Sequence, residues 1–375
     1  MKKVLKIIGL IVLVLLVVCL VVGIITTTRT NDFEYSIDYS TNTVTITGLV
    51  ASKSYKAHID IPKKIKGYPV TSISEYAFKG NEEILTLELP KTISYIGKGA
   101  FENCKNLKSV SGLEKCSELK TIEDNVFRGC YRLKKIKLPN NITSIGSAAF
   151  EFCRDLKELS IPNSVSYIGE RAFSNCQSIK EFKIPQKVTK IEDETFLGCY
   201  AMESITLSQG TTHIGIEAFD ACSKLKGVVI PASVTKIEAA AFVRCYSLLS
   251  IDVNSDNSAY ISVDGVLYNK DLTELVAYPA GKTDKTFSIP QGVTAIAKGT
   301  FTYNQNLETL NLPKSVNYIS NLFLYETLIK TINYEGSVSD WEKIVTDSTL
   351  DAGSLFETIN CTDGQIAIDG TVTYK

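Results

Sequence analysis

Cysteine is the residue type whose spacing in this 375-residue chain most invites chemistry. Six cysteines follow one another at intervals of 23 residues: Cys130, Cys153, Cys176, Cys199, Cys222 and Cys245. Cys104 precedes the first of them by 26 residues. A thiolate zinc site usually draws on cysteines that are separated by only about two to four residues. The chain has no such pair, so the sequence predicts no metal site, and nothing in it indicates a cofactor.

Cysteines that stack in successive repeats could also form disulfides. Stacking at the strand spacing of about 4.8 Å brings the Cα atoms within the range that a disulfide allows. Parallel side chains also keep their Cβ atoms about 4.8 Å apart, however, and a disulfide prefers about 3.5–4.5 Å. We therefore expect each thiol to be a small buried group that donates a weak hydrogen bond to a neighbouring carbonyl. The disulfide alternative stays open, and Cys116 and Cys361 lie outside the column.

Lysine recurs in the segment of each repeat that predicts the first strand, between the apolar residues of that segment. The eight lysines concerned are Lys108, Lys134, Lys135, Lys137, Lys157, Lys180, Lys183 and Lys226. Stacked in successive repeats, these lysines would form an electropositive strip that attracts an acidic partner. The alternative is a solvated sheet face whose charges resist aggregation, with Glu158 and Glu181 offsetting part of the repulsion.

Composition and motifs argue against nucleic acid and against catalysis. Residues 31–375 hold 36 Lys and Arg against 41 Asp and Glu, a net charge of −5, and no nucleic-acid-binding module is recognisable. Neither His58 nor His213 has a neighbouring pattern that suggests a triad. The G-x-S-x-G, phosphate-binding-loop and H-E-x-x-H motifs do not occur. The sequence therefore predicts a protein without enzymatic activity that binds no nucleic acid.

The cysteines and lysines belong to a phrase of 23 residues that repeats along the chain. It reads LKKIKLPNNITSIGSAAFEFCRD from residue 133 and returns from residues 156, 179, 202 and 225. A fixed period of about 20 to 50 residues indicates a solenoid. Within each repeat, the part LxxIxLP predicts a strand that ends at the proline. The part VTxIG predicts a second short strand. The part xxAFxxC predicts a helical turn with Phe and Cys on one side. The predicted fold is a β-rich repeat solenoid of parallel ladders with short helical or 3-10 turns.

The motif LPxxVTxIGxxAFxxCxxL resembles the BspA-type (Treponema-type) leucine-rich repeat over about residues 66–334. The tract NSAYISVDGVLYNK and the segment YEGSVSDWEKI also resemble segments common in that family. The resemblance implies a leucine-rich-repeat rod or horseshoe. Because the family is known mainly from bacterial surface proteins, some of them implicated in adhesion, it also implies a binding role. It supplies no catalytic residues, and the chain departs from the motif at Ser208 and Asn304.

Changes in the pattern divide the chain into six segments. They are an N-terminal signal-anchor transmembrane segment (1–30), an N-terminal β cap with the first half-repeat (31–83), leucine-rich repeats (84–250), an inserted hairpin tract (251–290), further leucine-rich repeats (291–334) and a C-terminal cap (335–375). The insertion is expected because Phe242 and Phe301 stand 59 residues apart, 36 more than one repeat. Asp264-Gly265 within it is a turn signal between two strand-like runs.

The N-terminus predicts a membrane anchor. Residues 7–25 form an uncharged apolar run of 19 residues, about 28 Å long as a helix and close to the thickness of a bilayer core. Lys2, Lys3 and Lys6 precede it, which favours a cytoplasmic N-terminus. We expect a single pass through the cytoplasmic membrane with the solenoid outside, at the cell surface. A cleaved signal peptide is the alternative.

These observations predict a membrane-anchored cell-surface leucine-rich-repeat protein that acts in adhesion or interaction. Its solenoid would bind a protein or glycan of a host or neighbouring cell through many weak contacts repeated along a rigid rod. The alternative is a structural envelope scaffold without a dedicated ligand. Charge reversal within the lysine strip separates the two, because only the first depends on contacts that the lysines make.

Overall fold

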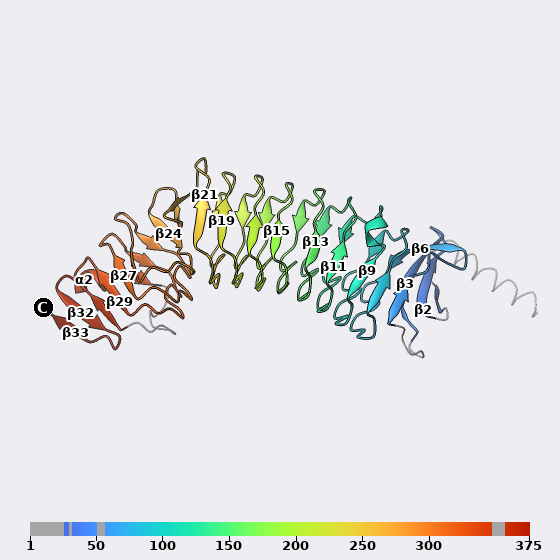
Figure 1. Cartoon of the computed structure of the whole chain (residues 1–375), viewed down its shortest axis with the longest axis horizontal. Helices are drawn as coiled ribbons and strands as arrows, with labels where there is room; N and C mark the ends of the chain where they lie inside the picture. Colours follow the sequence, from blue (N-terminus) through green and yellow to red (C-terminus); the bar gives the residue numbers. More distant parts are fainter. Residues whose placement is uncertain (1–25, 30–31, 51–56, 347–356) are drawn as a thin grey trace, which may run out of the picture.

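The computed structural model describes residues 26–29, 32–50, 57–346 and 357–375. They form an elongated, curved solenoid whose coils stack along the long axis, with a change of direction in the C-terminal third (Figure 1). No helix within these ranges is long and apolar enough to cross a membrane. The span predicted over residues 7–25 lies outside the described residues.

Each coil begins with a strand of three or four residues, and these strands make up the first-strand edge of the solenoid. They are β4 (His58–Asp60), β7 (Thr86–Glu88), β9 (Ser109–Ser111), β11 (Lys135–Lys137), β13 (Glu158–Ser160), β15 (Glu181–Lys183), β17 (Ser204–Thr206), β19 (Gly227–Ile230), β21 (Ser250–Val253), β25 (Thr286–Ser288), β27 (Thr309–Leu312), β29 (Thr331–Tyr334) and β31 (Thr358–Asn360). Neighbouring coils pair in parallel, as the repeat predicts, but the ladder is interrupted between β13 and β15, between β17 and β19, and between β21 and β25.

A second, shorter set of strands forms the second-strand edge. They are β6 (Tyr68–Ile73), β8 (Tyr95–Ile96), β10 (Thr121–Ile122), β12 (Ser144–Ile145), β14 (Tyr167–Ile168), β16 (Lys190–Ile191), β18 (His213–Ile214), β20 (Lys236–Ile237), β24 (Glu274–Ala277), β26 (Ala295–Ile296), β28 (Tyr318–Ile319) and β30 (Val345–Thr346). This edge is interrupted between β8 and β10, between β14 and β16, and between β20 and β24, and the second of these gaps lies at the junction that also separates β13 from β15. Isoleucine fills the inward position of most of these strands and is buried in the core.

The third edge carries Phe and Cys, and we call it the Phe/Cys edge. The sequence predicted a helical turn here, and that prediction is wrong, because left-handed residues interrupt the backbone on both sides of the phenylalanine. Around Phe173 they are Arg171 (φ 56°) and Asn175 (φ 59°), and a residue in that region cannot continue a right-handed helix. The described residues hold one 3-10 helix, η1 (Leu113–Lys115), and one short helix, α2 (Val338–Trp341).

The Phe/Cys edge is joined from coil to coil by hydrogen bonds and by stacked rings. Alternate N–H groups donate to the next coil, as from Phe127 to the carbonyl of Ala149 at 2.9 Å. The rings are buried, their centroids lie 5.1–5.8 Å apart, and their planes are within 15° of parallel. The stack comprises Phe78, Phe101, Phe127, Phe150, Phe173, Phe196, Phe219 and Phe242.

The extra residues after β21 form hairpin strands, as the turn signals predicted. β22 (Tyr260–Val263) pairs antiparallel with β23 (Val266–Asn269), and β23 pairs antiparallel with β24. Asp264 and Gly265 between β22 and β23 both have positive φ, as a tight two-residue hairpin turn requires. β24 then pairs in parallel with β26, so the hairpin strands lead into the next second-strand ladder.

Antiparallel strands cover both ends of the described solenoid. At the N-terminal end, β1 (Thr26–Arg29), β2 (Phe33–Asp38) and β3 (Thr43–Leu49) precede β6, and β5 (Lys64–Ile65) pairs with it. At the C-terminal end, β32 (Gly364–Ala367) and β33 (Val372–Tyr374) follow β31. Such caps cover the apolar cross-section of the last coils. The core forms two clusters of buried side chains, which meet at the neighbouring residues Val266 and Leu267 on β23.

Candidate binding surface

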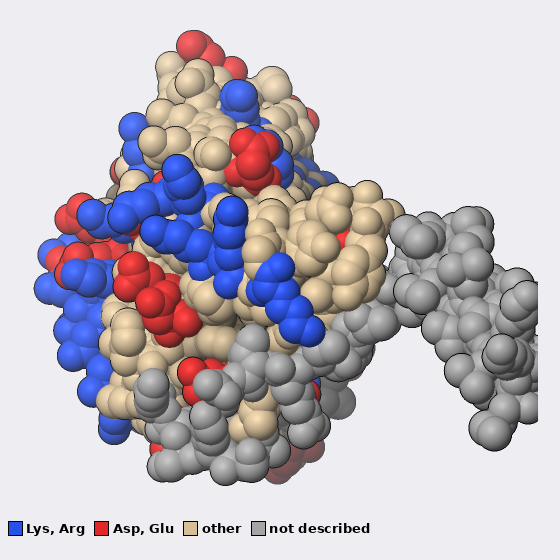
Figure 2. Space-filling model, turned by 90° about the vertical axis from the view of Figure 1, so that its right-hand side faces the viewer, with Lys and Arg blue, Asp and Glu red and all other residues tan. Residues whose placement is uncertain are grey.

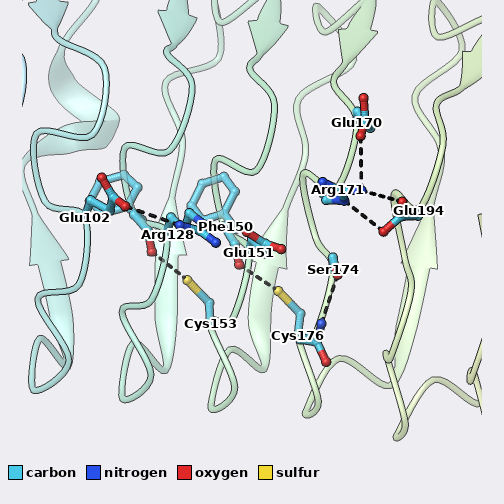
Figure 3. Close-up of polar contacts among 12 residues, drawn as sticks. Glu102, Arg128, Phe150, Glu151, Cys153, Glu170, Arg171, Ser174, Cys176 and Glu194 are labelled. Carbon is cyan, nitrogen blue, oxygen red and sulfur yellow. Dashed lines mark hydrogen bonds and ion pairs between the residues drawn. The ribbon is translucent and has the colours of Figure 1, made fainter.

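The thiols of the cysteine column all donate to the same kind of partner. The Sγ atom of Cys153 lies 3.2 Å from the carbonyl oxygen of Phe127, and that of Cys176 lies 3.2 Å from the carbonyl oxygen of Phe150 (Figure 3). The other thiols make the equivalent bond at 3.1–3.4 Å, namely Cys104, Cys130, Cys199, Cys222 and Cys245. The expected weak hydrogen bond to a neighbouring carbonyl is confirmed.

Burial makes these thiols poor nucleophiles. All nine cysteines in the described part of the chain are free and buried. Desolvation raises the pKa of the Cys104 and Cys199 thiols of the column to about 12. Because the thiolate is the reactive and metal-binding form, the column is inert near neutral pH. Within the described ranges, no three His, Cys, Asp or Glu side chains are placed to hold a metal ion.

Ion pairs between coils run beside the phenylalanine stack (Figure 3). Arg128 lies between the mostly buried carboxylates of Glu102 and Glu151 and donates to both. Further along, Arg171 binds Glu194 of the next coil in a bidentate manner, with Nε and Nη2 at 2.8 and 2.6 Å from the two carboxylate oxygens. These pairs connect neighbouring coils at the Phe/Cys edge, so their evident role is structural.

The predicted lysine strip lies on the first-strand edge, and all eight of its side chains are exposed. The N–H of Lys134 donates to the carbonyl of Lys108, and that of Lys157 to the carbonyl of Lys134, so these three lysines occupy equivalent places in successive coils. Lys135 and Lys137 project from β11, opposite Glu158 and Ser160 of β13. The strand register therefore places acidic and hydroxyl side chains within the strip.

Six lysines of the strip are not paired with a described acid. Lys180 and Lys226 share Glu203, each with Nζ at 3.9 Å from its carboxylate. Among the described residues, no ion pair involves Lys108, Lys134, Lys135, Lys137, Lys157 or Lys183. Figure 2 views the molecule along its long axis and shows basic side chains at the left of this view and across its centre, with acidic ones between them in places. The first-strand edge thus presents exposed positive charge at these six lysines, none of which forms a direct ion pair with a described residue.

A groove opens on this edge where the first-strand ladder is interrupted. β13 is the last strand of one ladder and β15 the first of the next, and the groove of about 820 Å³ lies between them. We call it the strand groove. Its walls carry hydroxyl, amide and charged groups as well as apolar ones, including Leu159, Ser160, Asn163, Glu181, Phe182, Lys183, Ser204 and Thr206. The sequence analysis missed this groove.

Phe182 lies at this opening, whereas the interruption between β17 and β19 has aliphatic inward residues. At the inward position of this strand the neighbouring coils carry Leu159 and Ile205, whereas Phe182 is aromatic. Its ring lies 4.7 Å from that of Phe196 in its own coil and 5.1 Å from that of Phe173 in the preceding coil. The ring therefore occupies space between two coils that a smaller side chain would leave for strand pairing. Most coils carry Leu, Ile or Val at this position, and the second phenylalanine, Phe287 of β25, also follows an interruption of the ladder, so phenylalanine here was the available sequence signal.

A smaller cavity of about 260 Å³ lies at the junction of the two core clusters. One wall is the alanine run Ala239–Ala241, and another comes from β24, where the half-buried Glu274 borders the space. Burial raises the pKa of Glu274. The sequence analysis missed this cavity too, although Ala239 and Ala240 stand where most of the other repeats carry larger side chains.

One exposed and two half-buried tyrosines, Tyr246, Tyr303 and Tyr325, cluster near the same junction, on the Phe/Cys edge. The rings of Tyr246 and Tyr303 lie 6.4 Å apart, and those of Tyr303 and Tyr325 lie 5.6 Å apart. The guanidinium of Arg244 lies over Tyr303 at 5.7 Å and is held by the buried carboxylate of Asp220. Such aromatic and arginine side chains are frequent in protein interfaces.

Comparison with known proteins identifies the class of this fold. A family model for the BspA-type leucine-rich repeat region matches six copies over residues 50–169, 143–273 and 282–348, which is more than half of the chain. No curated protein sequence matches the chain. Together with the repeated coils, the family match shows that the chain belongs to the BspA-type leucine-rich repeat family, as its motif suggested.

Two solved structures illustrate the similarity. A leucine-rich cell surface protein from Faecalibacterium prausnitzii is 25% identical, with a TM-score of 0.59, and the match covers 87% of this chain and 99% of that one. A leucine-rich repeat protein from Bacteroides ovatus is 23% identical, with a TM-score of 0.55, and the match covers 90% of this chain and 76% of that one. The second supports the fold alone. The chain is thus a leucine-rich-repeat solenoid of a bacterial surface-protein family.

Proposed function

We propose that the chain is a membrane-anchored surface protein whose solenoid binds a protein or glycan of a host or neighbouring cell. The anchor is the apolar segment of residues 7–25, which crosses the cytoplasmic membrane once with the N-terminus inside. Family membership and the similarity to a bacterial cell surface protein support an outward-facing solenoid. Such a protein needs no catalytic activity, and the proposal includes none.

The observation that carries the proposal is the set of six unpaired lysines on the first-strand edge. Like charges in neighbouring strands repel, so a column of exposed lysines does not stabilise the solenoid by itself. A partner with acidic groups would relieve this repulsion and would be attracted before contact. Repetition on a stiff rod allows several weak contacts to add up to useful affinity. The proposed partner is therefore acidic, either an acidic glycan or an acidic surface glycoprotein.

Charge reversal tests the strip. The variant carries Lys108→Glu, Lys134→Glu and Lys157→Glu, at three equivalent positions in successive coils. Binding of the purified full chain to arrays of sulfated glycans, sialylated glycans and host surface glycoproteins is measured. We expect the affinity for an acidic probe to fall at least tenfold, because attraction becomes repulsion at three neighbouring points. The loss should shrink as salt concentration rises.

A matched control makes the same charge change elsewhere. Lys98→Glu, Lys187→Glu and Lys224→Glu alter three exposed lysines outside the strip, and we expect partner binding to stay within about twofold. An equal loss in both triple variants would show that net charge, not the strip, drives binding. If the strip variant becomes more stable and every probe binds as before, the strip is not the site, and the structural-scaffold alternative gains support.

Mild protease treatment of intact cells tests the topology. Released peptides from the solenoid, with residues 1–29 left in the membrane, are the expected result. Solenoid peptides that appear only after lysis would contradict the surface location. An internal scaffold would then replace the adhesion proposal.

A further inference from the structure

The strand groove is bounded on two sides by strand edges without a ladder partner. β13 pairs with β11 on one side, and β15 pairs with β17 on one side, but within the described chain no backbone hydrogen bond joins β13 to β15. In several closed parts of the ladder, the residue before the proline donates to the next coil, as Ile184 does to Thr206 at 2.9 Å, although Leu138 before Pro139 does not. Ile161 makes no such bond. An unpaired edge of this kind is a template for another extended chain.

The opening also exposes apolar surface that is covered in other coils. Leu159 and Ile161 are only partly buried, whereas their counterparts in the preceding coil, Ile136 and Leu138, are 2% and 6% exposed. Exposed aliphatic surface at the base of a groove favours an occupant with an apolar side chain pointing inward. An extended peptide meets this need, because its side chains alternate between the two faces.

The charges on the groove walls change sign along the strands. Each strand has three residues, and we call equivalent positions in the two strands the first, second and third levels. Glu158 of β13 and Glu181 of β15 flank the opening at the first level. Ser160 and Lys183 flank it at the third level. All four side chains are exposed. An inserted strand would therefore be best matched by a basic residue at the first level, an apolar residue at the second, facing Leu159, and an acidic residue at the third.

We propose that the strand groove binds an extended segment of a partner protein, which enters between β13 and β15 as an additional strand. The preferred segment carries one basic and one acidic residue separated by a single apolar residue. This inference rests on the proposed binding role of the first-strand edge and narrows the partner there to a polypeptide. Glycan hydroxyls could contact the polar walls, but a glycan lacks the alternating N–H and C=O groups that pair with both strand edges.

Synthetic peptides provide the probes. A fluorescein-labelled heptapeptide, Ser-Thr-Lys-Val-Asp-Thr-Ser, is titrated with the purified full chain in detergent micelles, and fluorescence anisotropy is measured. We expect saturable binding. Peptides with charges of one sign, with Lys-Val-Lys or Asp-Val-Asp at the centre, should bind several-fold more weakly. In each of them one charged residue meets a like charge on the groove wall. N-methylation of the central valine removes one backbone donor and should weaken binding about tenfold.

Two protein variants locate the site. Lys183→Glu makes both levels acidic, so the preferred probe should change from Lys-Val-Asp to Lys-Val-Lys. Its matched control, Lys98→Glu, changes an exposed lysine outside both the strip and the groove and should leave both affinities within about twofold. Phe182→Ile gives β15 the same inward residue as β17, isoleucine, and should allow the ladder between β13 and β15 to close. We therefore expect peptide binding to fall at least tenfold, while the stability of the solenoid is not lowered.

Several results would overturn the groove as a peptide site. They are no saturable binding of any peptide, equal binding of the N-methylated peptide, or unchanged binding by both Lys183→Glu and Phe182→Ile. Saturable binding of a heparin hexasaccharide, lost in Lys183→Glu while no peptide binds, would assign the groove to a glycan instead. If the peptide fails but Lys108→Glu, Lys134→Glu and Lys157→Glu together abolish partner binding, the proposed function stands and only this inference fails.

Discussion

Two edges of the solenoid behave differently at the junction between the coil of residues 156–178 and the coil of residues 179–201. At the Phe/Cys edge the N–H groups of Arg171, Phe173 and Asn175 donate to the next coil at 3.1, 3.0 and 2.6 Å. Both strand edges are open at the same junction, between β13 and β15 and between β14 and β16. The two coils are therefore held together on one side and separated on the other.

The difference shows which contacts keep this rod continuous. Stacked buried rings, thiol–carbonyl bonds and backbone bonds all coincide at the Phe/Cys edge, whereas strands of two to four residues contribute few bonds each. Loss of strand pairing between two coils is therefore tolerated. An opened strand edge is a place where a solenoid can acquire a binding groove without losing its fold.

Removing a ring from the stack should have the largest effect. Phe173 is fully buried between the rings of Phe150 and Phe196, so Phe173→Ala should lower the free energy of unfolding by about 3–5 kcal/mol. Leu159→Ala in the same coil changes a half-buried residue at the open edge and should cost less than about 2 kcal/mol. Urea unfolding followed by circular dichroism measures both values. Equal losses of unfolding free energy in the two variants would contradict the conclusion that the Phe/Cys edge holds the coils together more strongly than the strand edges.

The sequence predicted the contacts that repeat but not those that break the repeat. The spacing of Phe150, Cys153 and Cys176 correctly indicated a buried column with thiols that donate to a neighbouring carbonyl. The opening beside Phe182 was not predictable in the same way, because it depends on how one ring packs against two coils in three dimensions. The hydrophobic pattern treats Phe, Leu and Ile as equivalent, and packing does not.

The turns at the Phe/Cys edge show a similar limit. The spacing of Phe and Cys fits one side of a helix, and the sequence analysis therefore predicted a helical turn. Residues such as Arg171 and Glu194 adopt positive φ although neither is Gly or Asn. Their conformation is imposed by hydrogen bonds to adjacent coils, which a local pattern does not contain.

Removing a thiol should have an intermediate effect. Cys176→Ala deletes the hydrogen bond to the Phe150 carbonyl and leaves a small void in the core, so the free energy of unfolding should fall by about 1–2 kcal/mol. Cys361→Ala in the C-terminal cap removes the same atoms from a buried thiol for which no such bond exists in the described structure. In the same urea experiment, Cys361→Ala should lower the free energy of unfolding by less than Cys176→Ala does. A larger loss at Cys361 would show that volume alone sets the cost.

Breaking the ion pair between Arg171 and Glu194 across the junction should have the smallest effect on stability. The size of this effect should depend on pH. The hydrogen bond from Arg171 lowers the pKa of Glu194 in the folded protein. A carboxylate with a lowered pKa stabilises the fold above the unfolded pKa of about 4.3, and this contribution is lost as the pH falls through the folded pKa. Arg171→Gln should therefore cost about 0.5–1 kcal/mol at pH 7 and almost nothing at pH 3.

A matched arginine provides the control for that pH dependence. Arg154 lies over the ring of Tyr131 at 4.6 Å, and no carboxylate in the described chain pairs with it. Arg154→Gln should have an effect that hardly changes between pH 3 and pH 7, because its contact is with an aromatic ring and involves no described carboxylate. If Arg171→Gln were equally insensitive to pH, the bidentate bond to Glu194 would contribute nothing across the junction. The stacked rings and backbone bonds of the Phe/Cys edge would then hold the two coils together without help from charge.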